Sequence, residues 1–260
     1  MGQSPLMLVV VAHPDDETFG TGSVIAAAAA RGARVVVCCA TRGEAGEDVS
    51  GTTNSPDELA KVREQELHAA AGVLGAAEVR VLDFADSGLD GEMPPGALAS
   101  GPLDDVVAAV EPVIKEYAPD VVVTLDFNGV NDHRDHMRIG EATTRAFERA
   151  AKPGARLYHW TLERSLMKRW LGQMKALGQL DEYVDMELGR ADEDITTIVD
   201  VRAVADQRRA AVAEHRTQFS VFTGLPPEFE EELLSRDSFI RIVPPWDGGP
   251  IETNLFGDAE

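Results

Sequence analysis

Two short stretches of the chain place imidazole and carboxylate side chains close together. Residues 13–17 read His-Pro-Asp-Asp-Glu, and residues 126–136 contain His133, Asp135 and His136. Because His133 and His136 are three residues apart, both can face the same way at the start of a helix. Two histidines and one aspartate make a three-ligand metal site that leaves a coordination position open for water. A divalent ion there would lower the pKa of bound water to about 7 and so favour hydrolysis of an amide.

Each stretch alone also has a simpler interpretation. Asp16 can cap the N-terminus of a helix, with Glu17 interacting favourably with the helix dipole. A lone histidine such as His133 is more often a partly buried, hydrogen-bonded side chain than a metal ligand. Helix capping leaves His13 and Asp15 unexplained, however, and the two stretches together favour a shared metal site.

The surrounding pattern predicts elements that bring both stretches to one edge of a sheet. Strands are predicted over residues 6–11, 34–40, 78–82 and 120–125, and helices over residues 18–31, 56–74, 103–117 and 134–151. This alternation predicts right-handed crossovers and a parallel sheet. If the first and fourth strands are neighbours in a doubly wound order, both stretches lie at the carboxyl edge, where open α/β folds bind ligands.

Two long loops follow predicted strands and so belong to the same edge. They cover residues 41–55 and 83–102, and long loops in this position are more often functional than not. We expect them to select the substrate. A nucleotide-binding site finds little support, because Gly20-Thr21-Gly22 lacks a third glycine at the required spacing.

The second half of the chain is less regular. Strands are predicted over residues 156–160, 195–199 and 239–243, and helices over residues 162–177 and 201–217. We therefore predict an α/β fold, a Rossmann-like three-layer sandwich with a mostly parallel sheet and an elaborated C-terminal portion. A single domain should span residues 1–260, with the core and its metal site in 1–150 and the elaboration in 151–260.

The composition argues against several classes of partner. The chain has 45 acidic and 24 basic residues and a net charge of −21, whereas nucleic acids and anionic membranes require a basic face. Cys38 and Cys39 are adjacent, so on a strand they point to opposite faces and no disulfide between them is expected. Because no signal peptide or membrane-spanning pattern is found, the sequence predicts a cytoplasmic protein without nucleic-acid or membrane partners.

The sequence resembles the LmbE/PIG-L family of metal-dependent N-deacetylases. The resemblance rests on Ala12-His13-Pro14-Asp15-Asp16-Glu17-Thr18 and His133-Arg134-Asp135-His136, with further similarity at Thr41-Arg42-Gly43-Glu44, Asp86-Ser87-Gly88 and His215-Arg216-Thr217-Gln218. It covers residues 6–150 and is looser beyond them. The family includes deacetylases of GlcNAc-phosphatidylinositol, GlcNAc-inositol and GlcNAc-malate.

The resemblance implies a role for each polar residue of the two motifs. Asp15 would be the general base that acts on metal-bound water. His133 would be an acid or an oxyanion stabiliser, oriented by Asp135. The ligands of a divalent ion, usually zinc, would be His13, Asp16 and His136.

Other positions would contact the substrate. Arg63 and Asp86 would touch the sugar or its substituent, although a solvated helix charge and a turn residue are the simpler interpretations. Asn131 stands where some relatives carry a tyrosine, and its amide can donate a hydrogen bond. We expect a structural or substrate-rim role for His215 rather than metal binding.

Together these observations predict an enzyme that uses a metal to hydrolyse the N-acyl amide, most simply an N-acetyl group, of a small soluble glycoside such as a GlcNAc derivative. One alternative is an amidase that cleaves a larger thiol conjugate at the same site, and another is a sugar-binding module without turnover. The expected cofactor is Zn²⁺, although two histidines and a carboxylate also suit Fe²⁺. Relatives of this kind often form homo-oligomers.

Overall fold

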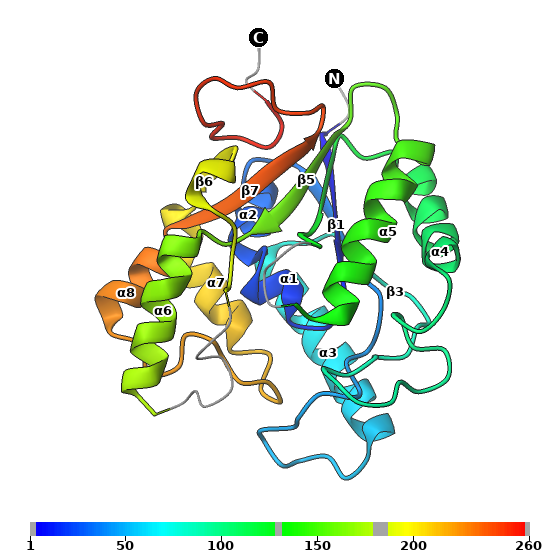
Figure 1. Cartoon of the computed structure of the whole chain (residues 1–260), viewed down its shortest axis with the longest axis vertical. Helices are drawn as coiled ribbons and strands as arrows, with labels where there is room; N and C mark the ends of the chain where they lie inside the picture. The colour runs from blue at the N-terminus through cyan, green and yellow to red at the C-terminus, as the bar shows by residue number, and fades with distance from the viewer. Residues whose placement is uncertain (1–3, 128–131, 179–186, 258–260) are drawn as a thin grey trace.

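A seven-stranded sheet forms the centre of the protein (Figure 1). The computed structural model describes residues 4–127, 132–178 and 187–257. Strands from both halves of the sequence share this sheet. In spatial order they are β3 (Glu78–Val81), β2 (Arg34–Cys39), β1 (Leu6–Val11), β4 (Val121–Leu125), β5 (Arg156–Thr161), β7 (Arg236–Val243) and β6 (Thr197–Asp200).

The central strand β1 lies between β2 and β4 and is parallel to both. Parallel pairing continues from β2 to β3 and from β4 to β5, whereas β7 is antiparallel to β5 and β6. Every residue of β1 and β4 is buried, because a parallel sheet is covered on both faces and its strands are apolar almost throughout. The predicted mostly parallel sheet and the predicted adjacency of the first and fourth strands are confirmed.

Helices cover both faces of the sheet, and the Rossmann-like three-layer α/β architecture is therefore confirmed (Figure 1). The α5 helix lies so close to β4 that a Cβ atom at Gly140 would be 2.3 Å from the carbonyl oxygen of Leu125. One face carries α4 (Leu103–Tyr117) and α5 (Arg134–Ala150), and the other carries α2 (Gly22–Ala30), α3 (Pro56–Leu74) and α7 (Ala205–Val212).

The helix predicted over residues 18–31 is divided into α1 (Asp16–Phe19) and α2. A tertiary contact explains the division: the guanidinium of Arg208, in α7, donates to the carbonyl oxygens of Thr18 (3.2 Å) and Phe19. In a continuous helix these oxygens would accept from backbone N–H groups four residues later. Since Arg208 is remote in the sequence, the local pattern did not indicate the break.

The C-terminal predictions need two further corrections. The helix predicted over residues 201–217 is shorter, because regular α-helix covers only α7 and the segment beyond it turns inward to bury His215 and Thr217. A helix was also missed at α8 (Pro227–Leu233), beside α6 (Arg164–Ala176). Side chains of these two helices belong to a small hydrophobic cluster separate from the main core.

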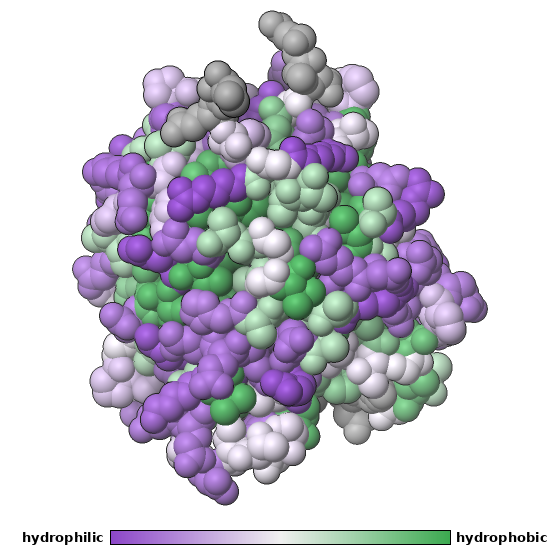
Figure 2. Space-filling model, turned by 180° about the vertical axis from the view of Figure 1, so that it is seen from behind, coloured by the Kyte–Doolittle hydropathy of each residue, from purple (hydrophilic) through white to green (hydrophobic). Residues whose placement is uncertain are grey.

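The surface agrees with a chain rich in charged residues. Seen from behind, hydrophilic side chains spread across the molecule and hydrophobic ones lie in areas between them (Figure 2). Among the described residues, no helix is long and apolar enough to cross a membrane.

We continue to propose one domain over residues 1–260, since β1 to β4 and β5 to β7 are hydrogen-bonded into one sheet.

Replacing Arg208 should destabilise the protein strongly. Its guanidinium also pairs with the buried carboxylate of Asp237 at 2.9 Å, and removing one partner of a buried ion pair typically costs about 3–5 kcal/mol. We expect Arg208→Ala to lower the free energy of unfolding by about this amount in a denaturant titration.

The control is Arg202→Ala, which removes an arginine whose ion pair with Asp200 is exposed on both sides. Exposed pairs contribute little to stability, so its unfolding midpoint should stay close to that of the wild type. If Arg208→Ala unfolded at the same midpoint as this control, the structural role given to Arg208 would be wrong.

Candidate metal and catalytic site

The first motif forms a tight turn between β1 and α1. The carboxylate oxygen Oδ2 of Asp16 accepts hydrogen bonds from the backbone N–H groups of His13 (2.9 Å) and Ala12 (3.2 Å). Asp16 therefore closes the turn that follows the strand. Its other oxygen, Oδ1, lies 3.2 Å from Nε2 of His136, so the same carboxylate joins the first motif to the second.

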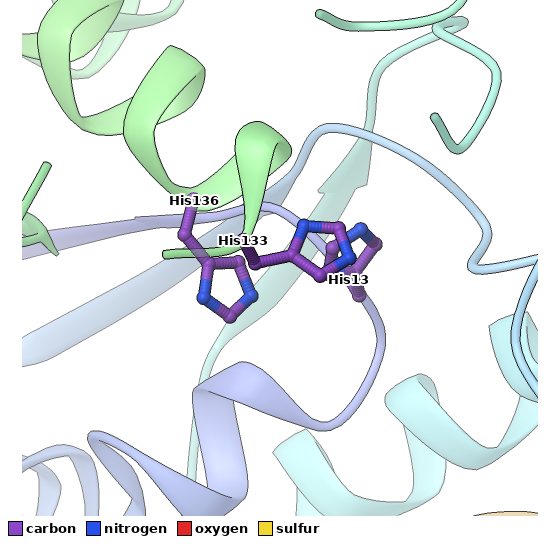
Figure 3. A group of neighbouring side chains, drawn as sticks. All are labelled: His13, His133 and His136. Carbon is purple, nitrogen blue, oxygen red and sulfur yellow. The ribbon is translucent and has the colours of Figure 1, made fainter. Parts of the chain in front are cut away.

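The second motif begins α5 at the neighbouring strand end. His133 precedes the helix, and its Nδ1 atom accepts the backbone N–H of Asp135 at 3.2 Å. His136 lies in the first turn and is buried. The rings of His13, His133 and His136 lie close together (Figure 3). The ring centroid of His13 is 4.7 Å from that of His133 and 5.3 Å from that of His136, and the latter two are 4.9 Å apart.

Three carboxylates surround His13. Its Nε2 atom lies 3.2 Å from Asp135 and 3.5 Å from Asp86, while Nδ1 lies 3.6 Å from Asp16. Burial opposes a charge on the ring, but hydrogen bonds to Asp135, Asp16 and Asp86 outweigh it and raise the pKa of His13 well above its usual value. So much negative charge around one imidazole makes the site attractive to a cation.

The donor atoms fit a divalent transition-metal ion. Within the described ranges, two overlapping groups bring their donor atoms within 4.8 Å of one another: His13, His133 and His136, and His13, Asp86 and Asp135. Imidazole nitrogens and carboxylate oxygens are typical zinc ligands. Oδ1 of Asp135 is buried with no hydrogen-bond partner among the described residues. The predicted ligand set of His13, Asp16 and His136 stays a prediction, and His133 is near enough to compete with Asp16.

The carboxylate of Asp135 contacts His13, and its predicted role in orienting His133 stays a prediction. Its Oδ2 atom lies 3.2 Å from Nε2 of His13 and accepts the backbone N–H of Ser87 at 2.9 Å. A carboxylate on the far nitrogen of a ligating histidine fixes the orientation of that ring. The backbone N–H of Asp135 donates to His133, whereas its carboxylate contacts His13 and can orient that ring.

Asp15, the predicted base, has an unusual backbone and a shifted pKa. Its φ angle is 127°, a value that a residue with a Cβ atom rarely adopts. Burial raises the pKa of Asp15 to about 6, against the opposing charge of Arg63. A carboxylate with a pKa near neutrality is well matched to general-base work at physiological pH.

In the described part of the chain, Arg63 binds backbone carbonyl groups and the carboxylate of the predicted base. Its guanidinium donates to the carbonyl oxygens of Gly43 (2.7 Å) and Pro14 (2.6 Å) and to the carboxylate of Asp15 (3.0 Å). A Cβ atom at Gly43 would lie 2.3 Å from Nη1 of Arg63, so this close packing requires glycine. The side chain is buried, and its predicted contact with substrate stays a prediction.

Asp86 joins the two long loops. Its carboxylate accepts from the backbone N–H groups of Gly88 (2.8 Å) and Ala45 (3.2 Å), in addition to its approach to His13. Arg134 stabilises the second of these loops, residues 83–102, by donating to the carbonyl oxygens of residues 87, 88, 90 and 91. Whether Asp86 contacts substrate stays a prediction, and the predicted contact Asn131 lies outside the described residues.

The pKa of His133 is shifted in the opposite direction from that of His13. Burial, followed by the neighbouring His13 and His136, lowers the pKa of His133 to about 4. Since Nδ1 accepts the N–H of Asp135, the proton of the neutral ring sits on Nε2. Of the two predicted roles, a neutral hydrogen-bond donor to an oxyanion fits this environment better than an acid.

Sequence reasoning missed a buried pair beside the first motif. Nε2 of His215 lies 2.8 Å from Oε1 of Glu17, and both side chains are fully buried. Burial opposes protonation, but Glu17 raises the pKa of His215. This contact agrees with the structural role expected for His215. The available signal was Glu17 itself, the fourth polar residue of residues 13–17, where the predicted metal ligands and base needed only His13, Asp15 and Asp16.

Comparison with known proteins identifies relatives along nearly the whole chain. The family model described as GlcNAc-PI de-N-acetylase, PIG-L, matches residues 8–147. A protein of Rhodococcus jostii strain RHA1, named 1D-myo-inositol 2-acetamido-2-deoxy-alpha-D-glucopyranoside deacetylase, is 36% identical over 284 residues. The match covers 96% of this chain and 97% of that protein.

Solved structures of similar fold include enzymes with different activities. N,N'-diacetylchitobiose deacetylase from Pyrococcus horikoshii superposes with a TM-score of 0.63 at 19% identity, covering 92% of this chain and 84% of that one. The 4-carboxy-2-hydroxymuconate hydratase of Pseudomonas putida KT2440 gives 0.61 at 18% identity, covering 95% and 99%. These likenesses show the fold alone.

The family assignment therefore rests on sequence. The matched residues 8–147 contain both motifs of the site. Together with 36% identity to a relative along almost the whole chain, this match shows that the protein belongs to the PIG-L family.

Proposed function

We propose that this protein removes the N-acetyl group from a small soluble GlcNAc glycoside, using a divalent ion held by His13, Asp16 and His136. The observation that carries the proposal is the 3.2 Å approach of Asp16 to His136, which joins two motifs 120 positions apart in the sequence into one cluster of metal donors. Zn²⁺ is the proposed ion, and Fe²⁺ is the alternative.

Each residue then has a separate task in amide hydrolysis. A bound divalent ion polarises the amide carbonyl and makes a neighbouring water more acidic. Asp15, held by Arg63, takes a proton from the attacking water as the new C–O bond forms. The same carboxyl group returns the proton to the departing nitrogen as the C–N bond breaks, so acetic acid and a free amine leave, and the acid then ionises to acetate in water.

His133 stabilises the negative charge that develops on the carbonyl oxygen. Nδ1 accepts the N–H of Asp135, so the neutral ring carries its proton on Nε2, and we propose that this Nε2–H donates to the oxyanion. Removing one such donor typically costs about 10²–10³ in kcat. Asp135 holds the ring of His13 in place through Nε2, and Nδ1, on the side of Asp16, is then the ring atom that would bind the ion.

The names of the relatives suggest the class of substrate. The Rhodococcus jostii relative is named for a GlcNAc-inositol, and we propose that this chain acts on a glycoside of that kind. Both cysteines are free and buried, which suits the reducing cytoplasm that we propose as its location. A homo-oligomer stays a prediction.

The first test is release of acetate from a panel of soluble N-acetylglucosaminides: GlcNAc-inositol, GlcNAc-malate and diacetylchitobiose. We expect release from at least one compound, with loss of activity in a chelator and recovery on adding back Zn²⁺. Metal bound at one equivalent without release from any compound would favour the amidase of larger conjugates. Release that a chelator leaves unchanged would contradict the metal mechanism.

Replacing the base should remove turnover and leave the metal in place. We expect Asp15→Asn to lower kcat by about 10²–10⁴-fold, the usual contribution of general acid–base catalysis, while elemental analysis finds wild-type metal content. Asp83→Asn is a suitable control because that carboxylate is 94% exposed beyond the end of β3. A near-normal kcat for Asp15→Asn would rule out Asp15 as the base.

Replacing His136 should instead remove the metal. The imidazole is buried and faces Asp16, so His136→Ala should lower the metal content after dialysis by at least tenfold and abolish activity. His68→Ala, at an exposed position of α3, should bind metal like the wild type. Equal metal content in the two variants would exclude His136 from the ligand set.

A further inference from the structure

Glu17 connects the predicted base to a residue from the other end of the chain. Its side chain is completely buried. Oxygen Oε2 accepts the backbone N–H of Asp15 at 2.9 Å, and Oε1 accepts from the Thr18 hydroxyl and lies 2.8 Å from Nε2 of His215. One carboxylate thus lies between the backbone of Asp15 and the ring of His215.

The backbone of Asp15 needs such support. Its φ angle of 127° is disfavoured for a residue with a side chain, and strained conformations persist only where the surroundings fix them. Arg63 holds the Asp15 carboxylate and the preceding carbonyl from one side. The N–H of Asp15 is held by Glu17, so the direction of this peptide depends on where the Glu17 carboxylate sits.

Glu17 depends in turn on His215. A buried carboxylate is costly unless charge or hydrogen bonds compensate it, and His215 is the basic group in contact with it. The segment around His215 is itself anchored, because the N–H and hydroxyl of Thr217 donate to Glu66 of α3. The ring of Phe19 lies edge-on to His215 at 5.7 Å.

We propose that His215 is a positioning residue that acts through Glu17 to fix the backbone, and with it the carboxylate, of the base Asp15. This inference rests on the proposed function for the role of Asp15. It places a residue beyond the matched stretch 8–147 in the support of the catalytic machinery, and it gives the C-terminal portion a task in turnover.

The sharpest test compares two amides at position 215. In glutamine, the amide nitrogen falls where Nε2 of histidine lies and can still donate to Glu17, whereas in asparagine it falls at the place of Nδ1. We expect His215→Gln to keep kcat within about threefold of the wild type, and His215→Asn and His215→Phe to lower kcat at least tenfold. KM and metal content should stay at wild-type values in all three zinc-loaded variants.

Two measurements separate positioning from a general structural role. Combining His215→Phe with Glu17→Gln should slow turnover no more than the slower single variant, because both act through one contact. In the NMR spectrum of ¹⁵N-labelled, zinc-loaded protein, the chemical shift of the Asp15 amide proton should change in His215→Phe. It should keep its wild-type value in His215→Gln. The spectrum needs no substrate, so it tests the contact even if the proposed function fails.

The proposal would be overturned by equal kcat values for the Gln and Asn variants, or by additive effects in the double variant. An Asp15 amide chemical shift that is unchanged in His215→Phe would also overturn it. Loss of metal together with kcat would also overturn it, since that outcome assigns His215 to the metal site. If His215→Phe does not fold, the comparison of Gln with Asn still decides. Failure of the wild type to release acetate would refute the proposed function and not this contact.

Discussion

The parallel pairing of β1 with β4 is the constraint on which the rest of the site depends. Met7 lies opposite Val121 and Val10 opposite Thr124, so the two strands end together. The first motif follows β1 and leads into α1, and the second motif begins α5, the helix that comes after β4. Because every residue of both strands is buried, sliding one along the other would move aliphatic side chains out of the core at one end of the sheet. The positions of the motifs are therefore set by the hydrophobic core.

The site concentrates negative charge that the fold alone does not neutralise. Asp16, Asp86 and Asp135 converge on His13, and each carboxylate is also bound to backbone N–H groups of a turn or loop. These hydrogen bonds hold the carboxylates in place without satisfying their charge. A divalent cation among them would compensate that charge, which is the physical reason to expect metal binding to stabilise the folded protein as well as to support chemistry.

The C-terminal portion supports the core from a distance. Arg208 holds the carbonyl groups at the end of α1, and His215 holds Glu17 within the same short helix. Arg190 pairs through two hydrogen bonds with the buried Asp126, which follows β4. The first two contacts are made to the helix of the first motif, and the third is made at the end of the strand that precedes the second motif. The elaboration therefore does more than complete the sheet, because its side chains also hold α1, which carries the end of the first motif, and Asp126, which follows β4.

The sequence by itself determined the strands of the parallel part of the sheet and the two motifs from which the site is predicted. Aliphatic runs indicated β1 and β4, and Ser55-Pro56 with Gly75 marked both ends of α3, because strand burial and helix caps leave local patterns. Only the tertiary structure decided the partners: which carboxylate orients His13, how Arg63 is buried against Asp15, and why the helix expected over residues 18–31 breaks. Such contacts join residues as far as 190 positions apart, and side chains that meet only after folding leave no periodicity or spacing in the sequence.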